Sequence, residues 1–525
     1  MNYQDTPEER RVMPNWRYFY QTQSLGELEN YSSAPFETHV YPIDDYIASW
    51  IEKKGVYRAG ELISEAIANG QKDNPHVVEA ADYIISQKIT DNPALVNTAR
   101  YITEAQGGFS DDIKKLSLGA IAKLTTAQDV QEKIHNIRIL LHRYPYNAIL
   151  YVDMARAYVS VGMLEKADNL MKLALWLAPN NRFVARAAAR LKVHRGNLDE
   201  ANYILHHTEL LKYDPWLIST EISVNTARNK TSSLIKKGVS MINSGNYHPF
   251  SFTELSSAIG TVEMFYGSRK KSRDMFKSSL ISPNDNSLAQ AEWAVINHVP
   301  ILVESEKYNL RCDFESKAYK AIAANDANGA VHHIVDWICD MPFSHKPITL
   351  GSNLSMEYLK DFELAAKILE VGLKANPGDD LMLNNIAYAL ARNNQPKEAR
   401  KFMSILETMD FDDMSYNMQA CVRATQGLIA YREKNFEEGY CLYSEAVKIA
   451  EENKDKDEIT YLKAIINFIR EQLIASGCTS LEPLQQLPRL DGIDKNNDLL
   501  ILKQEVEDLA VDGTIKPIKD STNLY

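Results

Sequence analysis

The sequence brings together a few side chains that could bind a metal ion or take part in catalysis: His332, His333 and Asp336, followed by Cys339. On a helix, His332 and Asp336 lie one turn apart on the same face and could share a cation. The alternative is structural: the apolar residues of the segment form a buried face, and the histidines lie at its polar border. We favour this second interpretation and expect no bound metal.

No sequence motif of a familiar catalytic or cofactor site is present. The chain lacks the glycine-rich loops that bind phosphates and dinucleotides, the serine elbow of hydrolases, and cysteine or histidine pairs at zinc-binding spacing. We therefore expect a protein that is not an enzyme and needs no cofactor. The alternative is an enzyme with a cryptic site in the less regular stretch 216–345, which would use His332, His333, Asp336 or Glu292.

The charge of the chain argues against a general binder of nucleic acid. The formal net charge of the 525 residues is −12, which disfavours polyanionic partners. One short basic run, Arg269-Lys-Lys-Ser-Arg273, could touch phosphates, but no aromatic residues for base stacking are interleaved with it. A solvated helix face is the interpretation that we favour for this run, and a regulator that binds nucleic acid through it is a second alternative function.

The cysteines and the hydropathy indicate a cytoplasmic protein. The five cysteines are sparse, odd in number and without paired spacing, which is typical of reduced thiols. The N-terminal residues have no apolar core of a secretory signal. Because no run of about 18 apolar residues occurs, we expect no membrane span.

Two segments of the chain, 162–171 and 196–205, repeat one pattern at an interval of 34 residues. A fixed period of this length with helical content is typical of stacked helix pairs. Such arrays form extended binding surfaces rather than catalytic pockets. The residue pairs in register are Gly162/Gly196, Leu164/Leu198, Ala167/Ala201 and Met171/Leu205.

The pattern resembles the tetratricopeptide repeat (TPR), a family of 34-residue helix–turn–helix units. A unit starting at Ala148 fills every position of the family pattern, with small residues where the two helices cross and large ones in the intervening holes. The residues at these positions are Tyr151, Ala155, Tyr158, Ala167, Met171, Ala174 and Pro179. The resemblance implies an all-α fold, a right-handed α-solenoid of antiparallel helix pairs.

Further units follow less regularly along the chain. A looser unit starts at Arg182 and a good one at Asp380, whereas the repeat register is lost between Pro215 and about Pro347. Degenerate copies are expected in the middle and at the ends of the array. We expect five parts: an N-terminal extension or cap (1–38), an N-terminal TPR-like array (39–215), a degenerate helical segment (216–345), a C-terminal TPR array (346–478) and a C-terminal tail (479–525).

The two ends of the chain leave alternatives open. Four aromatic residues stand within Trp16–Tyr20, outside any clear repeat, and they either cap the first helices or dock on a partner. We favour capping, because terminal repeats must cover their apolar face. In the tail we expect a short helix at Asp498–Leu509.

The resemblance also implies where partners bind, because the first helix of each TPR pair lines the concave groove. In the unit from Arg182 the groove positions include Arg186, Arg190 and His194, and the preceding unit adds Arg156. Arg186 and Arg190 are four residues apart and so share a helix face. Guanidinium groups bind carboxylates and phosphates through bidentate hydrogen bonds.

This groove resembles the carboxylate clamp of TPR proteins that bind chaperones, although Val152 fills one of the expected polar positions. We expect it to grip an acidic peptide or C-terminus. The alternatives are pairing with acids of the chain itself, or a solvated basic face.

A second candidate groove lies in the C-terminal array. It is built on Leu381, Asn384, Tyr388 and Arg392, and continues to Leu428, Tyr431 and Arg432. This mixture of apolar, aromatic and amide groups suits an extended or helical peptide.

Together these features predict a non-catalytic scaffold, adaptor or regulatory subunit that holds a partner protein in the groove of a TPR solenoid. We expect the partner to be a separately encoded enzyme or effector. Nucleic acid and membranes are not expected as partners, and a homo-oligomer is possible.

Overall fold

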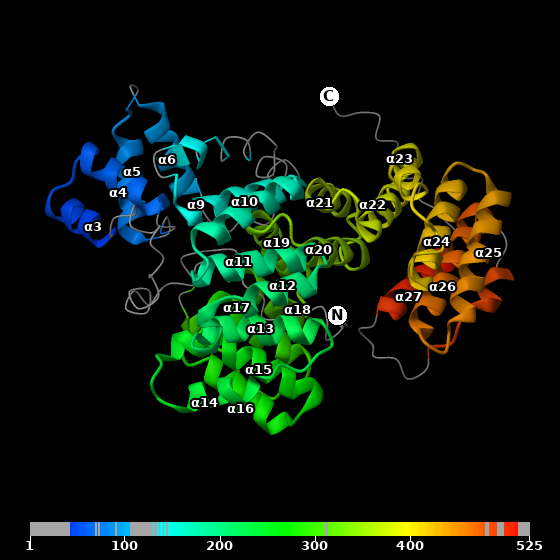
Figure 1. Cartoon of the computed structure of the whole chain (residues 1–525). Coiled ribbons are helices and arrows are strands. Elements are labelled where there is room, and N and C mark those ends of the chain that lie inside the picture. Colours follow the sequence, from blue (N-terminus) through cyan, green and yellow to red (C-terminus); the bar gives the residue numbers. More distant parts are fainter. Residues whose placement is uncertain are drawn as a thin grey trace. The chain divides into compact units, whose positions relative to one another are not determined.

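A computed structural model gives the fold of the chain. It describes residues 43–68, 71, 74–89, 92–104, 145–308, 310, 313–477, 482–490 and 498–512, together with short stretches between 130 and 142. Every regular element in these residues is a helix (Figure 1). Among them, no helix has both the length and the apolar character needed to cross a bilayer.

The described residues divide into two compact units, one that ends at Ser344 and one that begins at His345. The first unit contains α3 (Ile43–Glu52), α4 (Val56–Ala68), α5 (Pro75–Ser86), α6 (Pro93–Glu104), α9 (Ala148–Val159), α10 (Leu164–Leu177), α11 (Arg182–His194), α12 (Leu198–His206), α13 (Pro215–Ala227), α14 (Ile235–Asn243), α15 (Thr253–Tyr266), α16 (Arg269–Ser279), α17 (Asp285–Ile296), α18 (Phe314–Ala323) and α19 (Ala327–Asp340). The second contains α20 (His345–Glu357), α21 (Phe362–Ala375), α22 (Asp380–Arg392), α23 (Pro396–Leu406), α24 (Tyr416–Arg432), α25 (Phe436–Glu452), α26 (Glu458–Ala475) and α27 (Asp498–Asp512). Short 3-10 turns, η3 (Glu209–Lys212), η4 (Pro249–Phe252), η5 (Ser305–Lys307) and η6 (Glu482–Gln486), connect some of them.

The repeat predicted at 148–215 folds as two helix pairs, α9 with α10 and α11 with α12. The small residues predicted at the helix crossings, Ala155, Ala167 and Ala174, are fully buried. Since side chains this small let the two backbones approach, the helices of each pair can pack closely. The all-α fold of helix pairs is therefore confirmed.

Matching local signals set the bounds of these helices. Asn147 caps α9 and Asn181 caps α11, each accepting hydrogen bonds from backbone N–H groups of the first helical turn. The turns inside the two pairs pass through Gly162 and Gly196 at φ of 72° and 73°, a left-handed conformation that favours glycine.

The helix pairs do not stop at residue 215. Contacts join α15 to α16 and α18 to α19, and α13 lies against both α11 and α15. Side chains also meet at the repeat interval in this stretch: Thr253 donates to Ser287, 34 residues on, over 2.8 Å. The degenerate segment expected after Pro215 thus contains helix pairs, and side chains in it meet at the repeat interval although the sequence pattern fades.

In the second unit, α20/α21, α22/α23 and α24/α25 form successive pairs. The first helices of neighbouring pairs also pack on one another, α22 on α24 and α24 on α26. The helix predicted at Asp498–Leu509 is confirmed as α27, and α26 precedes it. We call the side of this unit formed by α20, α22, α24 and α26 its inner surface.

The helix crossing between α24 and α25 depends on two glycines at positions where the repeat requires small residues. A Cβ added at Gly427 would lie 2.7 Å from Cδ2 of Tyr443 and 3.1 Å from the carbonyl oxygen of Gly439. Tyr443 is buried, so its ring has no space into which it can shift.

We therefore expect Gly427→Ala to lower the free energy of unfolding by about 1–3 kcal/mol, the usual range for overpacking. Urea unfolding followed by circular dichroism measures this loss. Gly378→Ala is the matched control, because a Cβ at Gly378 meets nothing within 4 Å. Equal stability of the two variants would contradict the predicted packing.

Some sequence-based predictions lie outside the described residues. They include the aromatic cluster Trp16–Tyr20 and the rest of the N-terminal extension at 1–38. The part boundaries expected at 38/39, 215/216 and 478/479 remain predictions.

Candidate functional site

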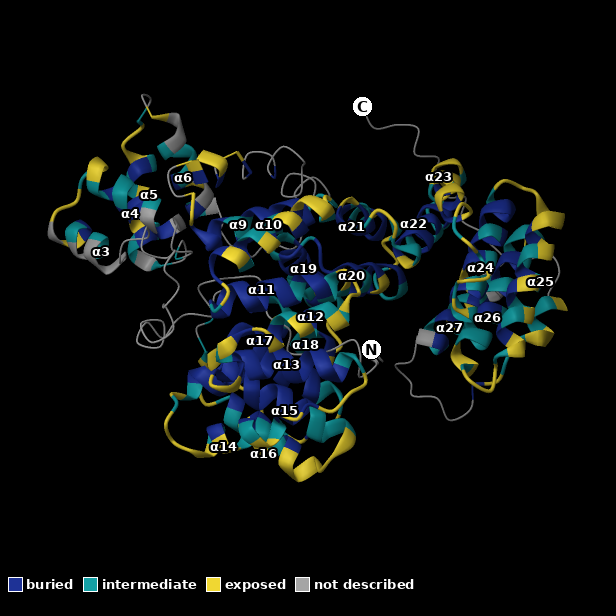
Figure 2. Ribbon diagram, in the orientation of Figure 1, coloured by how far each residue is buried: buried dark blue, intermediate teal, exposed yellow. Residues whose placement is uncertain are grey.

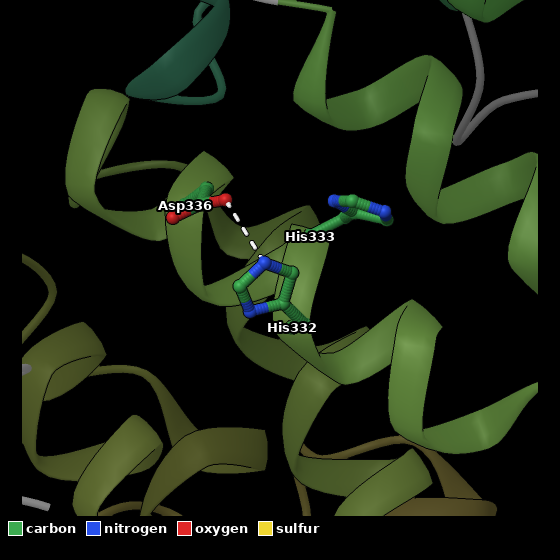
Figure 3. A group of neighbouring side chains, drawn as sticks. All are labelled: His332, His333 and Asp336. Carbon is green, nitrogen blue, oxygen red and sulfur yellow. Dashed lines mark ion pairs between the residues drawn. The ribbon is translucent and has the colours of Figure 1, made fainter. Parts of the chain in front are cut away.

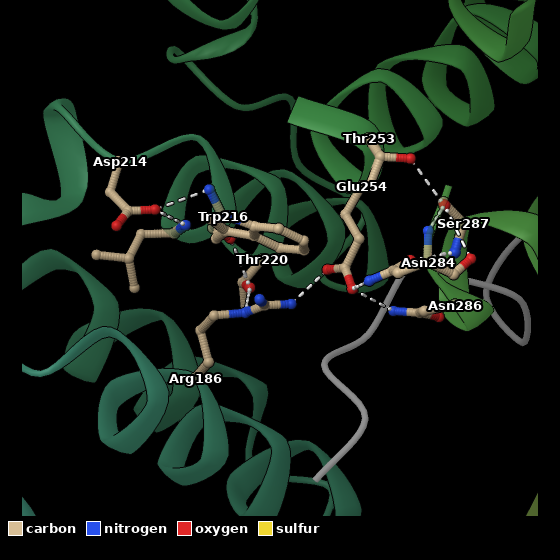
Figure 4. A network of polar contacts seen from close by, with 10 residues as sticks. Arg186, Asp214, Trp216, Thr220, Thr253, Glu254, Asn284, Asn286 and Ser287 are labelled. Carbon is tan, nitrogen blue, oxygen red and sulfur yellow. Dashed lines mark hydrogen bonds and ion pairs between the residues drawn. The ribbon is translucent and has the colours of Figure 1, made fainter. Parts of the chain in front are cut away.

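Arg186, the centre of the first predicted groove, is fully buried inside the first unit (Figure 4). Its Nη2 pairs with Glu254 of α15, and its Nε donates to Thr220 Oγ1 of α13 over 3.1 Å. The guanidinium also lies over the ring of Trp216, 5.1 Å from its centroid. Arg186 therefore belongs to the interior of the unit rather than to a binding surface.

The partners of Arg186 stand at the same position in successive repeats. Thr220 is 34 residues after Arg186, and Glu254 is 68 residues after it. Glu254 in turn accepts hydrogen bonds from Asn284 and Asn286 at the start of α17, over 2.8 and 3.1 Å. A ladder of buried polar groups thus runs across α11, α13, α15 and α17.

Burial of both faces of these helices explains why the ladder is internal. Residues 215–226 of α13 are all buried, and α11 and α13 are dark blue along most of their length in Figure 2. A buried guanidinium requires a counter-charge and hydrogen-bond acceptors. Glu254 and Thr220 supply them.

The other residues of the first groove are also engaged within the unit. Arg156 makes an ion pair with Asp340 over 3.6 Å and donates to the backbone carbonyl of the same residue. His194 packs edge-on against Phe343, and Arg190 is half-buried. Arg156 and Arg186 thus pair with acids of the chain itself, the alternative to an anion clamp of Arg156, Arg186 and Arg190 that the sequence left open. A role of Arg190 and His194 toward a partner stays a prediction.

The histidine cluster lies on α19 (Figure 3). His332 Nε2 is 3.9 Å from Asp336 Oδ2, and one ligand atom from each of His332, His333 and Asp336 lies within 4.8 Å of the others. Burial and the neighbouring His332 and Lys317 lower the pKa of His333 to about 4, so its imidazole is neutral at pH 7. Two imidazoles and a carboxylate could hold a transition-metal ion.

Geometry nevertheless favours the structural interpretation of this cluster. Ligand atoms bound to zinc lie about 2.0–2.2 Å from the ion, and the groups would have to draw together to reach such distances. His332 and Asp336 are both buried, as expected of the polar border of a packed helix face.

Glu292 of α17, the other residue considered for catalysis, is buried as well. Burial raises the pKa of Glu292 to about 7, against the opposing effects of Lys320 and Ser305. The protonated form is thus the one that the fold favours. An unfolded chain has an ordinary glutamate pKa, so the raised pKa of Glu292 adds to the stability of the folded state at low pH. This contribution to stability is present at pH 5 and is lost as the pH rises to 8.

We expect Glu292→Gln to leave stability near that of the wild type at pH 5, where Glu292 is largely protonated. At pH 8 it should raise the free energy of unfolding by up to about 3 kcal/mol. Melting of the variant and the wild type at both pH values measures the difference. An effect of the substitution that does not change with pH would contradict the raised pKa.

The basic run Arg269–Arg273 opens α16. Lys271 Nζ lies 3.9 Å from Glu263 Oε1, and Arg273 Nε lies 3.6 Å from Asp274 Oδ1. These weak ion pairs on a polar helix fit the solvated face that we favoured for this run.

The second predicted groove forms part of the inner surface of the second unit. Asn384, Tyr388 and Arg392 follow one another along α22, and Tyr431 and Arg432 end α24. Arg392 Nη1 donates to the Tyr388 hydroxyl over 2.9 Å, and its guanidinium lies over the ring of Phe362, 4.5 Å from the centroid. Asn384 and Tyr431 are buried, so the polar groups that mark this surface are the two arginines and the Tyr388 hydroxyl.

Both arginines bind carboxylates from the end of the chain. Arg392 Nη2 lies 2.7 Å from Glu505 Oε1 of α27, and Arg432 Nη1 lies 2.5 Å from Glu471 Oε2 of α26. Two further cations complete the network: Lys360 lies 3.0 Å from Glu505, and Arg470 Nε donates to Glu471 over 2.9 Å.

This network sets the protonation state of the two acids. Burial alone would raise the pKa of Glu505, but the charges of Arg470, Arg392 and Lys360 outweigh it and lower the pKa to about 2. The pKa of Glu471 is lowered in the same way by Arg470 and Arg432. Both carboxylates are therefore charged throughout the physiological range.

Sequence reasoning identified a third of this network. It singled out Arg392 and Arg432 through their place in the repeat, but not Lys360, Arg470, Glu471 or Glu505. The available signal was the tail helix, in which Leu499, Leu502 and Val506 recur at helical spacing beside an acidic residue.

The described residues form successive helix pairs, a fold of the tetratricopeptide type. Similar solved structures include yeast Tom70 (11% identity, 87% of this chain and 95% of that chain, TM-score 0.28). Human IFIT1, as a dimer with m7Gppp-AAAA, is another (12%, 92% and 95%, 0.26), and so is the TPR domain of P58(IPK) (13%, 71% and 99%, 0.20). Likenesses this distant carry no inference about function. No protein-family model matches the sequence, and no curated protein sequence matches it.

Proposed function

We propose that this chain is a non-catalytic scaffold that holds a partner protein on the inner surface of its second unit. The observation that carries the proposal is the set of cations there, Lys360, Arg392, Arg432 and Arg470, beside the hydroxyl of Tyr388. Guanidinium groups in a partly desolvated groove bind carboxylates strongly and specifically.

The partner that we favour is a separately encoded enzyme or effector whose bound segment is acidic. The residues of this surface already bind a carboxylate and bury apolar residues of the chain's own α27. An acidic partner segment would make the same two kinds of contact. The cytoplasm remains its proposed location. The three described cysteines, Cys339, Cys421 and Cys441, form no disulfide, in keeping with that proposal.

Affinity capture with the full chain as bait, from its native cells, tests this function. We expect the wild type to retain a partner protein, and Arg392→Glu to retain at least about tenfold less of it. Reversal of a buried interfacial charge costs several kcal/mol of binding free energy. The matched control is Arg400→Glu, because Arg400 forms an ion pair with Glu433 that is largely exposed on the second helix of a pair.

Helix content and melting of both variants, measured by circular dichroism, show whether the fold is kept. Equal retention by the wild type, Arg392→Glu and Arg400→Glu would place the binding surface elsewhere and contradict the proposal.

A further inference from the structure

The helix α27 lies on the inner surface in a way that differs from a further repeat. It packs on α26 and also contacts α20, and its Glu505 reaches Arg392 of α22. It therefore touches three of the four helices that form the inner surface, α20, α22 and α26. Peptides that bind in a solenoid groove make contacts of this kind, across repeats.

The apolar face of α27 provides the second element of a bound helix. Leu499, Leu502 and Val506 are buried in a cluster with Ile469 and Leu473 of α26. Their spacing of three and four residues places them on one side of the helix. Any amphipathic helix with the same spacing could supply these contacts.

The charges on the surface exceed what α27 neutralises. The ion pairs join four cations, Lys360, Arg392, Arg432 and Arg470, to two carboxylates, Glu471 and Glu505. Of the two carboxylates, only Glu505 comes from α27, and it lies 3.9 Å from Arg470 Nη1, beyond hydrogen-bond distance.

Two donors of Arg470 remain without an acceptor in this network. Its side chain is 1% exposed, and neither Nη1 nor Nη2 has a hydrogen-bond partner. A buried donor without an acceptor costs about 1–3 kcal/mol, and more when it is charged. A helix that places a carboxylate closer to Arg470 would remove this cost.

Resting on the proposed function, we propose that the partner segment is an acidic amphipathic helix and that α27 occupies its binding site in the isolated chain. The apolar residues of the partner helix take the place of those of α27, and its carboxylates pair with Arg392 and Arg470. Since α27 is tethered, with an effective concentration on the order of millimolar, the partner displaces it only by making better contacts. The unused donors of Arg470 make such contacts available.

A fluorescent peptide of residues 498–512 is the probe, and fluorescence anisotropy is the readout. The wild-type chain should bind it weakly, because its own α27 is in place. The full chain with Leu502→Asp and Glu505→Lys, which removes the apolar and acidic contacts of α27, should bind it at least about tenfold more tightly. The peptide with Glu505→Lys should bind this variant at least about tenfold more weakly than the unmodified peptide.

No binding of the unmodified peptide to the double variant, with helix content and melting as in the wild type, would overturn the inference. So would equal binding of the two peptides. If the double variant loses helix content, the wild-type chain with excess peptide is the second arm. The unmodified peptide should then raise amide hydrogen exchange in its α27, and the Glu505→Lys peptide should not. Unchanged exchange with the unmodified peptide would overturn the inference.

The two proposals fail differently. If capture of a partner depends on Arg392 but the peptide binds neither chain, the surface binds a segment of another kind, and only the present inference is wrong. If the peptide binds as expected but Arg392→Glu retains every captured protein, the surface serves α27 alone, and the proposed function is wrong.

Discussion

Replacement of Glu254 by alanine is expected to lower the free energy of unfolding of the first unit by about 3–5 kcal/mol. The substitution leaves Arg186 fully buried without its counter-charge, and it removes the acceptor of Asn284 and Asn286. An uncompensated charge in the interior costs more than the loss of packing alone. Urea unfolding, with amide hydrogen exchange to identify which unit opens, measures the effect.

The matched control for this prediction is Asp199→Ala, because the carboxylate of Asp199 pairs with Arg228 while its side chain is 83% exposed. Exposed ion pairs contribute about 0–1 kcal/mol. The double substitution Arg186→Met with Glu254→Leu should recover much of the loss, since it removes both charges together. A loss for Glu254→Ala no larger than for Asp199→Ala would contradict the role given to the buried ladder.

Glu471→Ala should destabilise the second unit by a similar amount, about 3–5 kcal/mol. Glu471 is fully buried and is the carboxylate that Arg432 and Arg470 share. Without it the inner surface holds four cations against Glu505 alone. We expect urea unfolding to show the loss and amide hydrogen exchange to locate it in α24 and α26.

Here Glu433→Ala is the control, because it breaks the largely exposed pair with Arg400 in the same unit. Equal stability of Glu471→Ala and Glu433→Ala would contradict this prediction, because the ion pairs of the inner surface would then contribute no more than independent surface pairs do.

The sequence was sufficient to predict the repeat fold, because its strongest signals are local. Small residues at fixed positions, such as Ala155 and Ala167, and the glycine turns at Gly162 and Gly196 come from the geometry of a single helix pair. In the middle of the first unit the sequence predicted a degenerate helical segment, because α13, α15 and α17 are buried along most of their length. Helix α13 therefore lacks the apolar periodicity of an amphipathic helix.

The candidate sites were harder to predict, since charge pairing depends on residues far apart in the chain. Arg186 was assigned to a binding groove from its position in the repeat, yet the acid that neutralises it, Glu254, stands two repeats further on. The interval of 68 residues was visible in the sequence. Which of the possible pairs forms across repeats is set by side-chain packing, which the repeat pattern does not contain.

The sequence also did not predict where α27 packs. Its amphipathic pattern predicted a helix but not the surface that it covers, because an apolar stripe specifies burial without specifying against what. Glu505, through its pairs with Lys360 and Arg392, is the residue that relates the tail to the inner surface.

Amide hydrogen exchange of the full chain, with and without the captured partner, tests the central claim most directly. In the chain alone, α27 and the facing helix α22 should both be protected. On binding of the partner, exchange in α27 should rise while α22 stays protected, because another helix has taken the place of α27. Protection of α27 that remains unchanged while the partner is bound would contradict the account.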